Sequence, residues 1–448
     1  MIKPVLDSNF IPAKVWNDEF LKTADRPFCI AVEREDGLIF RVDTFLGADK
    51  DKNNFYVERK VKHILWAAGG WKVMLAGDRD VYEYIRDAYT ADGLRAFDVD
   101  FWSTVYQKDF VVEEREFADM PQSSSNPLPI GRHLDGCRVG FDAGGSDIKV
   151  TSVVDGEVVF SQEIVWLPKV NSDINYHYDN VRKAIELAAS KMPRCDAVGV
   201  SSAGVIVKSR PMQCSLFMEV PKDTLEQKEK CRNIYLETGK ALGIPMVVAN
   251  DGDIAALAAS MALDKNAVLG IAMGTSEAGG YVDRDGHVTG WQNELAFAPV
   301  DYFTGAERDD WSQDFGVGAS YFSQYAVIRL APAAGIELDP SLTPAEKLKV
   351  VQGLLEQGDK RAEQIFESIG TYFGYAVANY SEFYDVDYIQ ISGRVTSGRA
   401  GDIIINKAYE VLGAEYPELK EKITLFLPGE YERRIGQAVA AASLVNLG

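Results

Sequence analysis

Residues 139–149 read VGFDAGGSDIK, a pattern typical of a strand that runs into a Gly-rich turn. An apolar strand delivers Asp142 to its end, and Gly144, Gly145 and Ser146 follow. Glycines let backbone N–H groups approach an anion closely, and a serine hydroxyl adds another donor. Asp142 is a hard oxygen ligand suited to Mg²⁺ on a phosphate chain, directly or through water. Alone, the pattern is more typical of an ordinary hairpin, because a single Gly-rich turn is a weak signal.

Two later segments repeat the passage from a strand into a Gly-rich turn. Residues 271–281, IAMGTSEAGGY, carry Gly274, Thr275 and Ser276, which suit a second phosphate cradle. Residues 389–398, IQISGRVTSG, form a third turn with room for a flat base and a ribose. Three such units within one α/β frame are far more specific than any one of them.

Two carboxylates are candidates for chemistry on a hydroxyl group. Asp251, in VVANDGDIA, stands between a buried strand and a helix start. Two interpretations are equally open for Asp251: a purely structural helix N-cap, or a general base at the mouth of a cleft. Glu294, in GWQNELAFAPVD, follows the second Gly-rich turn and, taken alone, is more typical of a solvated acid.

The order of elements predicts an α/β protein with a further N-terminal part. A hairpin, helix, strand, helix and strand begin at Arg138, and the order recurs near Ala267, which indicates two similar lobes. We expect one helix over 223–243, stopped by Gly243, and another over 179–192 opened by an Asx cap. A mainly helical stretch is predicted for 309–384, and a small-residue helix suited to close packing near the C-terminus.

A Pro- and Ser-rich linker at 120–132, MPQSSSNPLPIGR, is predicted to separate the N-terminal part. The predicted domains are therefore an α+β module of unknown role at 1–128, a first lobe at 129–265 and a second lobe at 266–448. Within the module, we expect strands at 28–35, 38–46, 54–68 and 71–77, followed by a helix from residue 79.

The composition narrows the classes of partner. The 448 residues include 67 acids and 47 bases, for a formal net charge of −20. Such a chain is a poor candidate for nucleic acid, whose binding depends on Lys and Arg, and for an anionic membrane. The five cysteines are widely spaced with no C-x-x-C, which favours reduced thiols. Without a signal-like N-terminus or an apolar membrane span, we expect a cytoplasmic protein.

Together, these motifs resemble the sugar-kinase/actin/heat-shock ATPase superfamily and, within it, the ROK group of sugar kinases and sugar-responsive repressors. The likeness covers about 138–448. It rests on DAGGSDIK for the first phosphate motif, VGVSSAG for the strand that opens the sugar cleft, ANDGDIAALA for the catalytic N-D-x-N-x-A segment, MGTSEAGG for the second phosphate motif, NELAF for G-E-x-G-H, and ISGRV for the adenosine motif.

The resemblance implies a fold, an activity and a set of residue roles. The fold is an actin-like ATPase fold of two ribonuclease-H-like lobes, and the activity is Mg²⁺- and ATP-dependent phosphorylation of a sugar held between the lobes. Asp251 is implied as the base. The implied sugar contacts are Asn250, Glu294 and Ser202, and Asp142 organises Mg²⁺. The implied nucleotide contacts are Asp142, Gly144, Gly145, Ser146, Gly274, Thr275, Ser276 and Gly393. Related kinases often form homodimers, the commonest assembly.

Several residues depart from the family pattern. Phe297 stands where G-E-x-G-H ends in His, and the family's Cys-rich zinc motif is absent, so no structural zinc is expected. Asp147 and Glu277 add two carboxylates beside the phosphate motifs, where a like-charge pair at about 4 Å costs about 4 kcal/mol at an effective dielectric near 20. Either Mg²⁺ screens them, or they point away, or nucleotide binding is weakened.

Two other functions therefore stand beside the kinase. One is a sugar- or nucleotide-binding regulator without turnover, with 1–128 as its partner-binding module. The other is an unrelated α/β protein whose glycine turns are purely structural.

Overall fold

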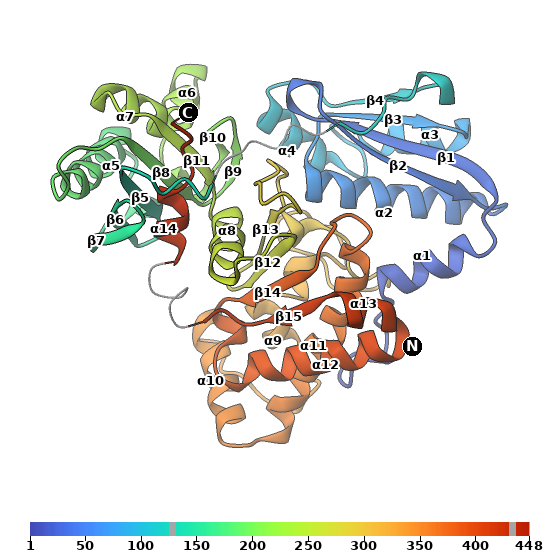
Figure 1. Ribbon diagram of the computed structural model, residues 1–448. Helices are drawn as coiled ribbons and strands as arrows, with labels where there is room; N and C mark the ends of the chain where they lie inside the picture. Colours follow the sequence, from blue (N-terminus) through green and yellow to red (C-terminus); the bar gives the residue numbers. More distant parts are fainter. Residues whose placement is uncertain (125–130, 430–435, 448) are drawn as a thin grey trace. The chain divides into compact units, whose positions relative to one another are not determined.

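The computed structural model describes residues 1–124, 131–429 and 436–447 (Figure 1). Its contacts divide the chain into two compact units. The first unit contains residues 1–126, 271–279 and 293–427, and the second contains 127–270, 280–292 and 428–448. Strands β12 (Val268–Met273) and β13 (Glu277–Val282) each contribute residues to both units.

The first unit begins with a four-stranded sheet in the order β2-β1-β3-β4. Strand β1 pairs antiparallel with β2 and β3, and β4 runs parallel to β3. Helix α2 extends along one face of this sheet (Figure 1). The elements are β1 Arg26–Glu33, β2 Ile39–Leu46, β3 Lys72–Ala76 and β4 Val111–Glu114, with α1 Ala13–Leu21, α2 Lys50–Ala68, α3 Arg79–Ala88 and α4 Ala96–Tyr106.

The strand predicted for 54–68 is wrong, because these residues belong to helix α2. The Asp49 side chain caps the helix by accepting the N–H groups of Asp51 and Lys52. Almost every residue from Asn53 to Ala68 is buried, so the helix shows no polar face and its β-branched and aromatic residues resemble a strand. The strands predicted on either side, at 28–35, 38–46 and 71–77, are confirmed as β1, β2 and β3 within a residue or two.

The rest of the first unit is a sheet in the order β13-β12-β14-β15 with helices around it. Helix α11 is almost completely buried, and Gly370 and Gly374 let α12 approach closely: a Cβ at Gly374 would lie 2.6 Å from the Cβ of Val411. The elements are β14 Tyr388–Ser392, β15 Thr424–Phe426, α9 Gln324–Leu330, α10 Pro344–Glu356, α11 Lys360–Tyr380, α12 Arg399–Glu415 and α13 Pro417–Lys422, with the short helices η5 Leu295–Phe297, η6 Gly318–Ser320 and η7 Arg394–Thr396. The predicted helical stretch is thus largely confirmed.

Residues 1–126 share their unit with 293–427, a grouping that differs from the predicted division into three segments. The backbone N–H of Ala13 donates to the carbonyl of Val300 at 3.0 Å, and that of Asn293 donates to Ala67 at 2.8 Å. The His63 ring of α2 stacks on Phe383 with 3.9 Å between centroids. The N-terminal segment is therefore an integral part of the first unit. The linker predicted at 120–132 lies partly, and its boundary at 128 entirely, outside the described residues, and the boundaries at 128 and 265 stay predictions.

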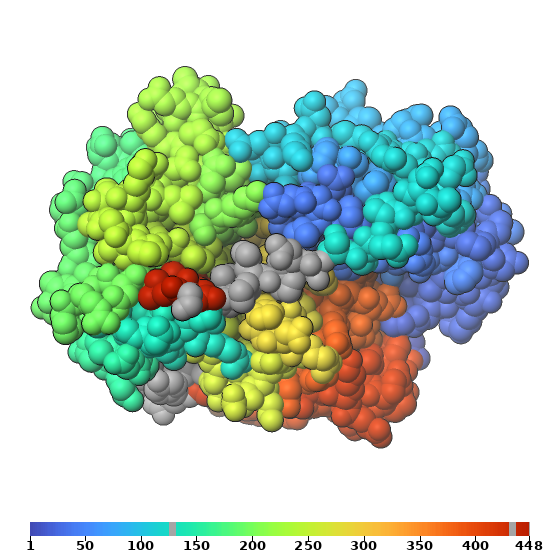
Figure 2. Space-filling view, turned by 45° about the horizontal axis from the view of Figure 1, so that its top comes forward, coloured from blue at the N-terminus to red at the C-terminus, as the bar shows by residue number. Residues whose placement is uncertain are grey.

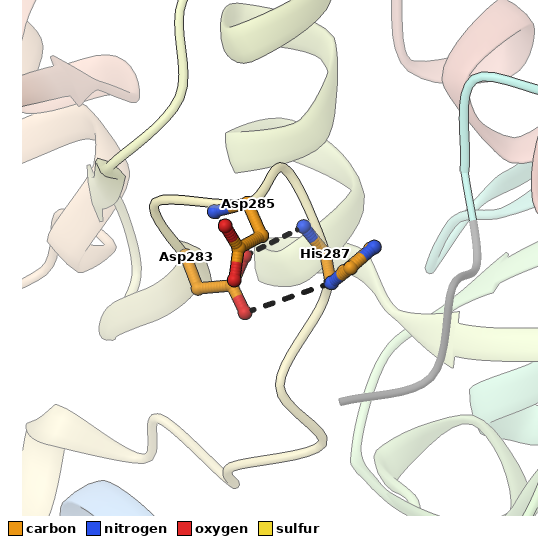
Figure 3. Close-up of side chains that lie close together, drawn as sticks. All are labelled: Asp283, Asp285 and His287. Atoms are coloured by element: carbon orange, nitrogen blue, oxygen red, sulfur yellow. Dashed lines mark hydrogen bonds and ion pairs between the residues drawn. The ribbon is translucent and has the colours of Figure 1, made fainter. Parts of the chain in front are cut away.

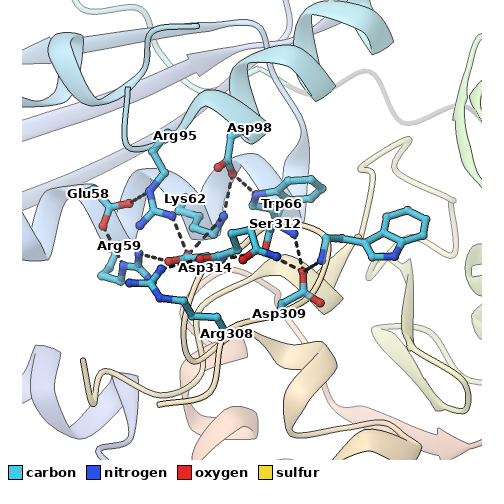
Figure 4. A network of polar contacts seen from close by, with 12 residues as sticks. Glu58, Arg59, Lys62, Trp66, Arg95, Asp98, Arg308, Asp309, Ser312 and Asp314 are labelled. Carbon is cyan, nitrogen blue, oxygen red and sulfur yellow. Dashed lines mark hydrogen bonds and ion pairs between the residues drawn. The ribbon is translucent and has the colours of Figure 1, made fainter. Parts of the chain in front are cut away.

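A buried ion-pair network joins α2 to the turn at 309–314 (Figure 4). Asp314 accepts a hydrogen bond from Arg59 at 3.0 Å, and its Oδ2 forms ion pairs with Arg95 at 2.7 Å and with the Nζ of Lys62 at 3.5 Å. Glu58 and Asp98 complete three cations and three carboxylates, none of them more than 4% exposed. Sequence reasoning missed this network, because a run such as ERK ordinarily marks a solvated surface.

The second unit is built on a five-stranded sheet in the order β11-β8-β5-β6-β7. Strands β11, β8 and β5 are parallel, whereas β6 and β7 extend the sheet as an antiparallel hairpin. The elements are β5 Cys137–Ala143, β6 Asp147–Val154, β7 Glu157–Val165, β8 Ala197–Ser202, β9 Val205–Val207, β10 Arg210–Gln213 and β11 Met246–Asn250, with α5 Ile174–Ala189, α6 Leu225–Arg232, α7 Ile234–Leu242, α8 Asp251–Leu263 and α14 Gln437–Ala442.

Close packing of α14 on this sheet confirms the small-residue helix predicted at the C-terminus. A Cβ at Gly140 of β5 would lie 1.9 Å from the carbonyl oxygen of Ala438, and one at Gly199 of β8 would lie 1.6 Å from that of Ala441. Only glycine fits at both positions. Figure 2 shows the residues after α14, in red, at the surface among green and teal segments of the same unit.

Two helix predictions in the second unit need correction. The helix predicted at 223–243 is broken at Asn233 into α6 and α7, although Gly243 ends it in a left-handed conformation as expected. The helix predicted at 179–192 begins earlier, at Ile174, and its cap is Asp173. Among the described helices, none combines the length and the apolar character needed to cross a bilayer.

Candidate active site

Two hydrogen bonds from Trp166 stabilise the turn after β5. The backbone N–H of Trp166 donates to the carbonyl of Ser146 at 3.2 Å, and its indole N–H donates to that of Gly144 at 2.7 Å. Gly145 and Ser146 are exposed, and among the described residues nothing accepts from their N–H groups. This exposed pair of donors is the kind of backbone arrangement that binds an anion. Sequence reasoning did not single out Trp166.

Asp147 closes the same turn. Its carbonyl accepts the N–H of Gly144 at 2.9 Å, and its carboxylate accepts the Ser146 hydroxyl at 3.2 Å. A Cβ at Gly144 would lie 2.8 Å from that carbonyl oxygen, so the close approach requires glycine. The Asp147 carboxylate therefore remains beside the predicted phosphate contacts and is only partly buried.

Three parallel strands bring the other predicted groups of the second unit to one sheet edge. In register, Asp142 of β5 stands opposite Ser201 of β8, and Ser202 of β8 stands opposite Asn250 of β11. Asp251 follows as the first residue of α8. The carboxyl ends of parallel strands are where α/β proteins bind ligands. The structure therefore places these predicted groups along one edge of the sheet, and their roles stay predictions.

The Asp251 carboxyl is suited to accept a proton near neutral pH. Burial by the surrounding protein, and then the negative charge of Asp142, raise its pKa to about 6. The Gly252 N–H donates to its Oδ1 at 3.0 Å and opposes this rise. Burial also raises the pKa of Asp142, against the stabilising effects of Ser201 and Lys149. Perturbed carboxyls of this kind gather at functional sites.

Asn250 and Ser202, both predicted sugar contacts, already have partners within the protein. The Asn250 amide oxygen caps α8 by accepting the Gly252 N–H at 2.7 Å, and its nitrogen donates to the carbonyl of Gly204 at 2.8 Å. Ser202 is fully buried, and its hydroxyl shares a hydrogen bond of 3.0 Å with that of Tyr235. Both residues fix the backbone from which Asp251 projects.

The first unit brings the second phosphate motif and the adenosine motif together. A Cβ at Gly393 would lie 2.4 Å from the carbonyl oxygen of Met273, and the φ of Gly393 is +93°, so only glycine suits this contact. In the turn after β12, the Gly274 N–H donates to Ser276 at 2.9 Å. Thr275 and Ser276 are exposed, which makes their hydroxyls accessible to a ligand.

Glu277 does not place a charge on this turn. Its side chain is only 4% exposed and accepts a hydrogen bond from the Tyr380 hydroxyl at 3.2 Å. The Glu277 carboxyl therefore points away from the second phosphate motif. The Asp147 carboxylate, in contrast, stays at the first one.

Glu294 and Phe297 lie at the ends of η5. Glu294 is partly exposed and precedes the helix. Phe297 packs on the N-terminal segment, with its ring centroid 4.5 Å from that of Trp66 and 5.5 Å from that of Phe97. The departure from the family's His is thus accounted for by aromatic packing against residues 1–124.

A cluster of Asp283, Asp285 and His287 follows β13 (Figure 3). Oδ1 of Asp283 accepts the backbone N–H groups of Asp285 and His287 at 3.0 and 2.8 Å. The bond from Asp285, two residues on, is that of an Asx turn, and the bond from His287 closes the same loop, so turn geometry explains the grouping.

Comparison with solved structures identifies the fold. A ROK hexokinase from Thermus thermophilus superposes with a TM-score of 0.53 at 19% identity, covering 68% of this chain and 96% of that one. A ROK-family transcriptional regulator, a homologue of the E. coli MLC protein, gives 0.55 at 17% identity, covering 69% and 78%. The chain has the ROK fold. A Streptococcus pneumoniae ROK protein solved with sucrose gives 0.51 at 13% identity, covering 68% and 96%.

No family model and no curated protein matches this sequence. The resemblance read from the motifs is therefore confirmed at the level of the ROK fold, which holds both kinases and regulators. The predicted site residues are divided between the two units. The second unit contains Asp142, Gly144, Gly145, Ser146, Ser202, Asn250 and Asp251. The first unit contains Gly274, Thr275, Ser276, Glu294 and Gly393.

Proposed function

We propose that this protein is an ATP-dependent kinase that phosphorylates a hydroxyl group of a sugar. The observation that carries the proposal is the Asp251 carboxyl, whose pKa of about 6 suits a base, at a sheet edge shared with Asp142 and a turn of exposed donors in a ROK fold. Phosphoryl transfer depends on positioning and charge neutralisation rather than on covalent chemistry, and these residues supply such functions.

In this mechanism Asp251 removes the proton from the attacking sugar hydroxyl. The sugar oxygen forms a bond to the γ-phosphorus of ATP, the bond to the β-γ bridging oxygen breaks, and ADP leaves. Glu294 accepts hydrogen bonds from other sugar hydroxyls. Asn250 and Ser202 hold the Asp251 segment in place, because a direct sugar contact would cost each its present partner.

The turns at Gly144–Ser146 and Gly274–Ser276 are proposed to donate to phosphate oxygens, and Gly393 to adjoin the adenosine. The hard oxygens of Asp142 and of the Ser146–Asp147 turn fit Mg²⁺, which prefers carboxylate and hydroxyl ligands. When bound, Mg²⁺ supplies positive charge that offsets the phosphates and the Asp147 carboxylate.

The test is sugar-dependent release of ADP from Mg·ATP across hexoses, amino sugars and N-acyl sugars. A kinase releases ADP with at least one class, and Asp251→Asn lowers that rate by about 10²–10⁴-fold, the usual contribution of a general base. Asp264→Asn is the matched control, because Asp264 is 99% exposed at the end of the same helix.

A sugar- or nucleotide-binding regulator without turnover is the second candidate. It is favoured by the likeness to a ROK transcriptional regulator and by the Asp147 carboxylate at the first phosphate turn. Calorimetric binding of ATP or a sugar, with no ADP release on any sugar, supports this candidate over the kinase.

A further inference from the structure

Glu277 is a buried carboxyl one residue after the exposed Thr275–Ser276 turn. It begins β13 and is 4% exposed. Its Oε1 accepts the Tyr380 hydroxyl from α11, whereas its Oε2 is buried without a hydrogen-bond partner in the described part of the chain. A buried polar atom without a partner is costly, so the protonation state of this group matters.

A second acceptor lies beside Oε2. A Cβ at Gly318 would lie 2.0 Å from Oε2 and 2.5 Å from the carbonyl oxygen of Leu295, so both oxygens lie close to the same point. Leu295 directly follows Glu294 and begins η5. Two neighbouring acceptors repel, whereas a proton on Oε2 allows one of them to donate to the other.

The surroundings favour the neutral acid. Burial raises the pKa of Glu277 to about 8, and the only described group that lowers it is Tyr380. Among the described residues, the titratable neighbours of Tyr380 are Glu277 itself, Tyr384 and His63 of α2. Burial raises the pKa of Tyr380 and lowers that of His63 to about 3, so both are uncharged near neutral pH.

We propose that Glu277 is a positioning residue that, as a neutral acid, ties the Thr275–Ser276 turn to α11 and to the segment carrying Glu294. Two hydrogen bonds make this connection: the Tyr380 hydroxyl donates to Oε1, and the protonated Oε2 donates to the Leu295 carbonyl. The backbone of Glu277 continues directly from the turn. Ionisation of Glu277 removes the hydrogen bond to the Leu295 carbonyl and leaves two oxygens that repel each other. The catalytic consequence rests on the proposed function, because it concerns a phosphate turn and a sugar contact.

Glu277→Gln tests whether Glu277 acts as a neutral acid, because an amide group keeps an acceptor and a donor at every pH. The folded-state pKa exceeds the usual value, so wild-type stability is lost as pH rises through about 8. From pH 7 to 9, the wild-type folding equilibrium constant should fall about tenfold relative to Glu277→Gln. The kcat/KM ratio of Glu277→Gln to wild type should rise about tenfold over that range, and Glu337→Gln, at an exposed site, should track wild type.

Several results overturn the inference. Identical pH profiles of stability for wild type and Glu277→Gln reject it, as does a Glu277→Gln variant with the larger loss above pH 8. If Glu277→Gln fails to fold, infrared spectra of wild type decide: the inference requires a protonated carboxyl band at pH 7 that fades by pH 9. The stability and infrared readouts need no turnover, so a protein that releases no ADP fails only the proposed function.

Discussion

Replacing Asp314 by alanine should destabilise the first unit by about 3–5 kcal/mol, the usual cost of removing one partner from a buried ion pair. Asp314 is 4% exposed and forms ion pairs with Arg59 at 3.0 Å, with Arg95 at 2.7 Å and with Lys62 at 3.5 Å. Its loss leaves three buried cations facing only two carboxylates. Repairing that imbalance requires water or a counter-ion to enter a closed region between α2 and the 309–314 turn.

Urea unfolding followed by tryptophan fluorescence and by circular dichroism measures this loss. At roughly 2 °C per kcal/mol for a unit of this size, the melting temperature should fall by about 6–10 °C. Asp310→Ala is the matched control: Asp310 belongs to the same turn but is exposed, so its removal should change stability by less than about 0.5 kcal/mol. Equal effects of the two variants, or a loss below about 1 kcal/mol at Asp314, would refute the role given to the network.

Further predictions concern the site and the fold. kcat/KM should fall as pH drops through about 6, because only ionised Asp251 accepts a proton. Asp142→Asn should lower the pKa of Asp251 in a carboxyl NMR titration, because the Asp142 charge raises it. A chain lacking 1–124 should lose soluble, cooperatively folded protein, since Phe297 and Asp314 would be uncovered; a cooperative melt of that chain would contradict this. Ser146→Gly should weaken binding of an ATP analogue about 10–100-fold by calorimetry, the range for one hydrogen bond to a charged group, with unchanged affinity as the opposing result.

Local rules account for what the sequence predicted well. A strand that ends in Gly-rich residues specifies its own turn, so β5, β12 and β14 and their turns were predictable. That Asp142, Ser201, Ser202 and Asn250 lie near one another also follows from parallel strands ending at one edge, with Asp142 opposite Ser201 and Ser202 opposite Asn250. These are the parts of the candidate site that depend on short stretches of chain.

Tertiary burial accounts for what the sequence did not predict. Helix α2 looks like a strand because its charged residues are buried together with its apolar ones, which removes the helical polarity. Arg59 is buried because it pairs with Asp314, which is more than 250 positions away in the sequence. The sequence around Arg59 therefore does not show that it belongs to the core. Glu277 reads as a charge on a phosphate turn until Tyr380 and Gly318 enclose it.

ADP release from Mg·ATP, compared between wild type and Asp251→Asn over a panel of sugars, separates a kinase that uses Asp251 as its base from a binding protein without turnover. We expect release that depends on one class of sugar and that falls at least 100-fold in Asp251→Asn, with the melting temperature within about 2 °C of wild type. Release that persists at most of its rate in Asp251→Asn, or that no sugar stimulates in wild type, would contradict this expectation.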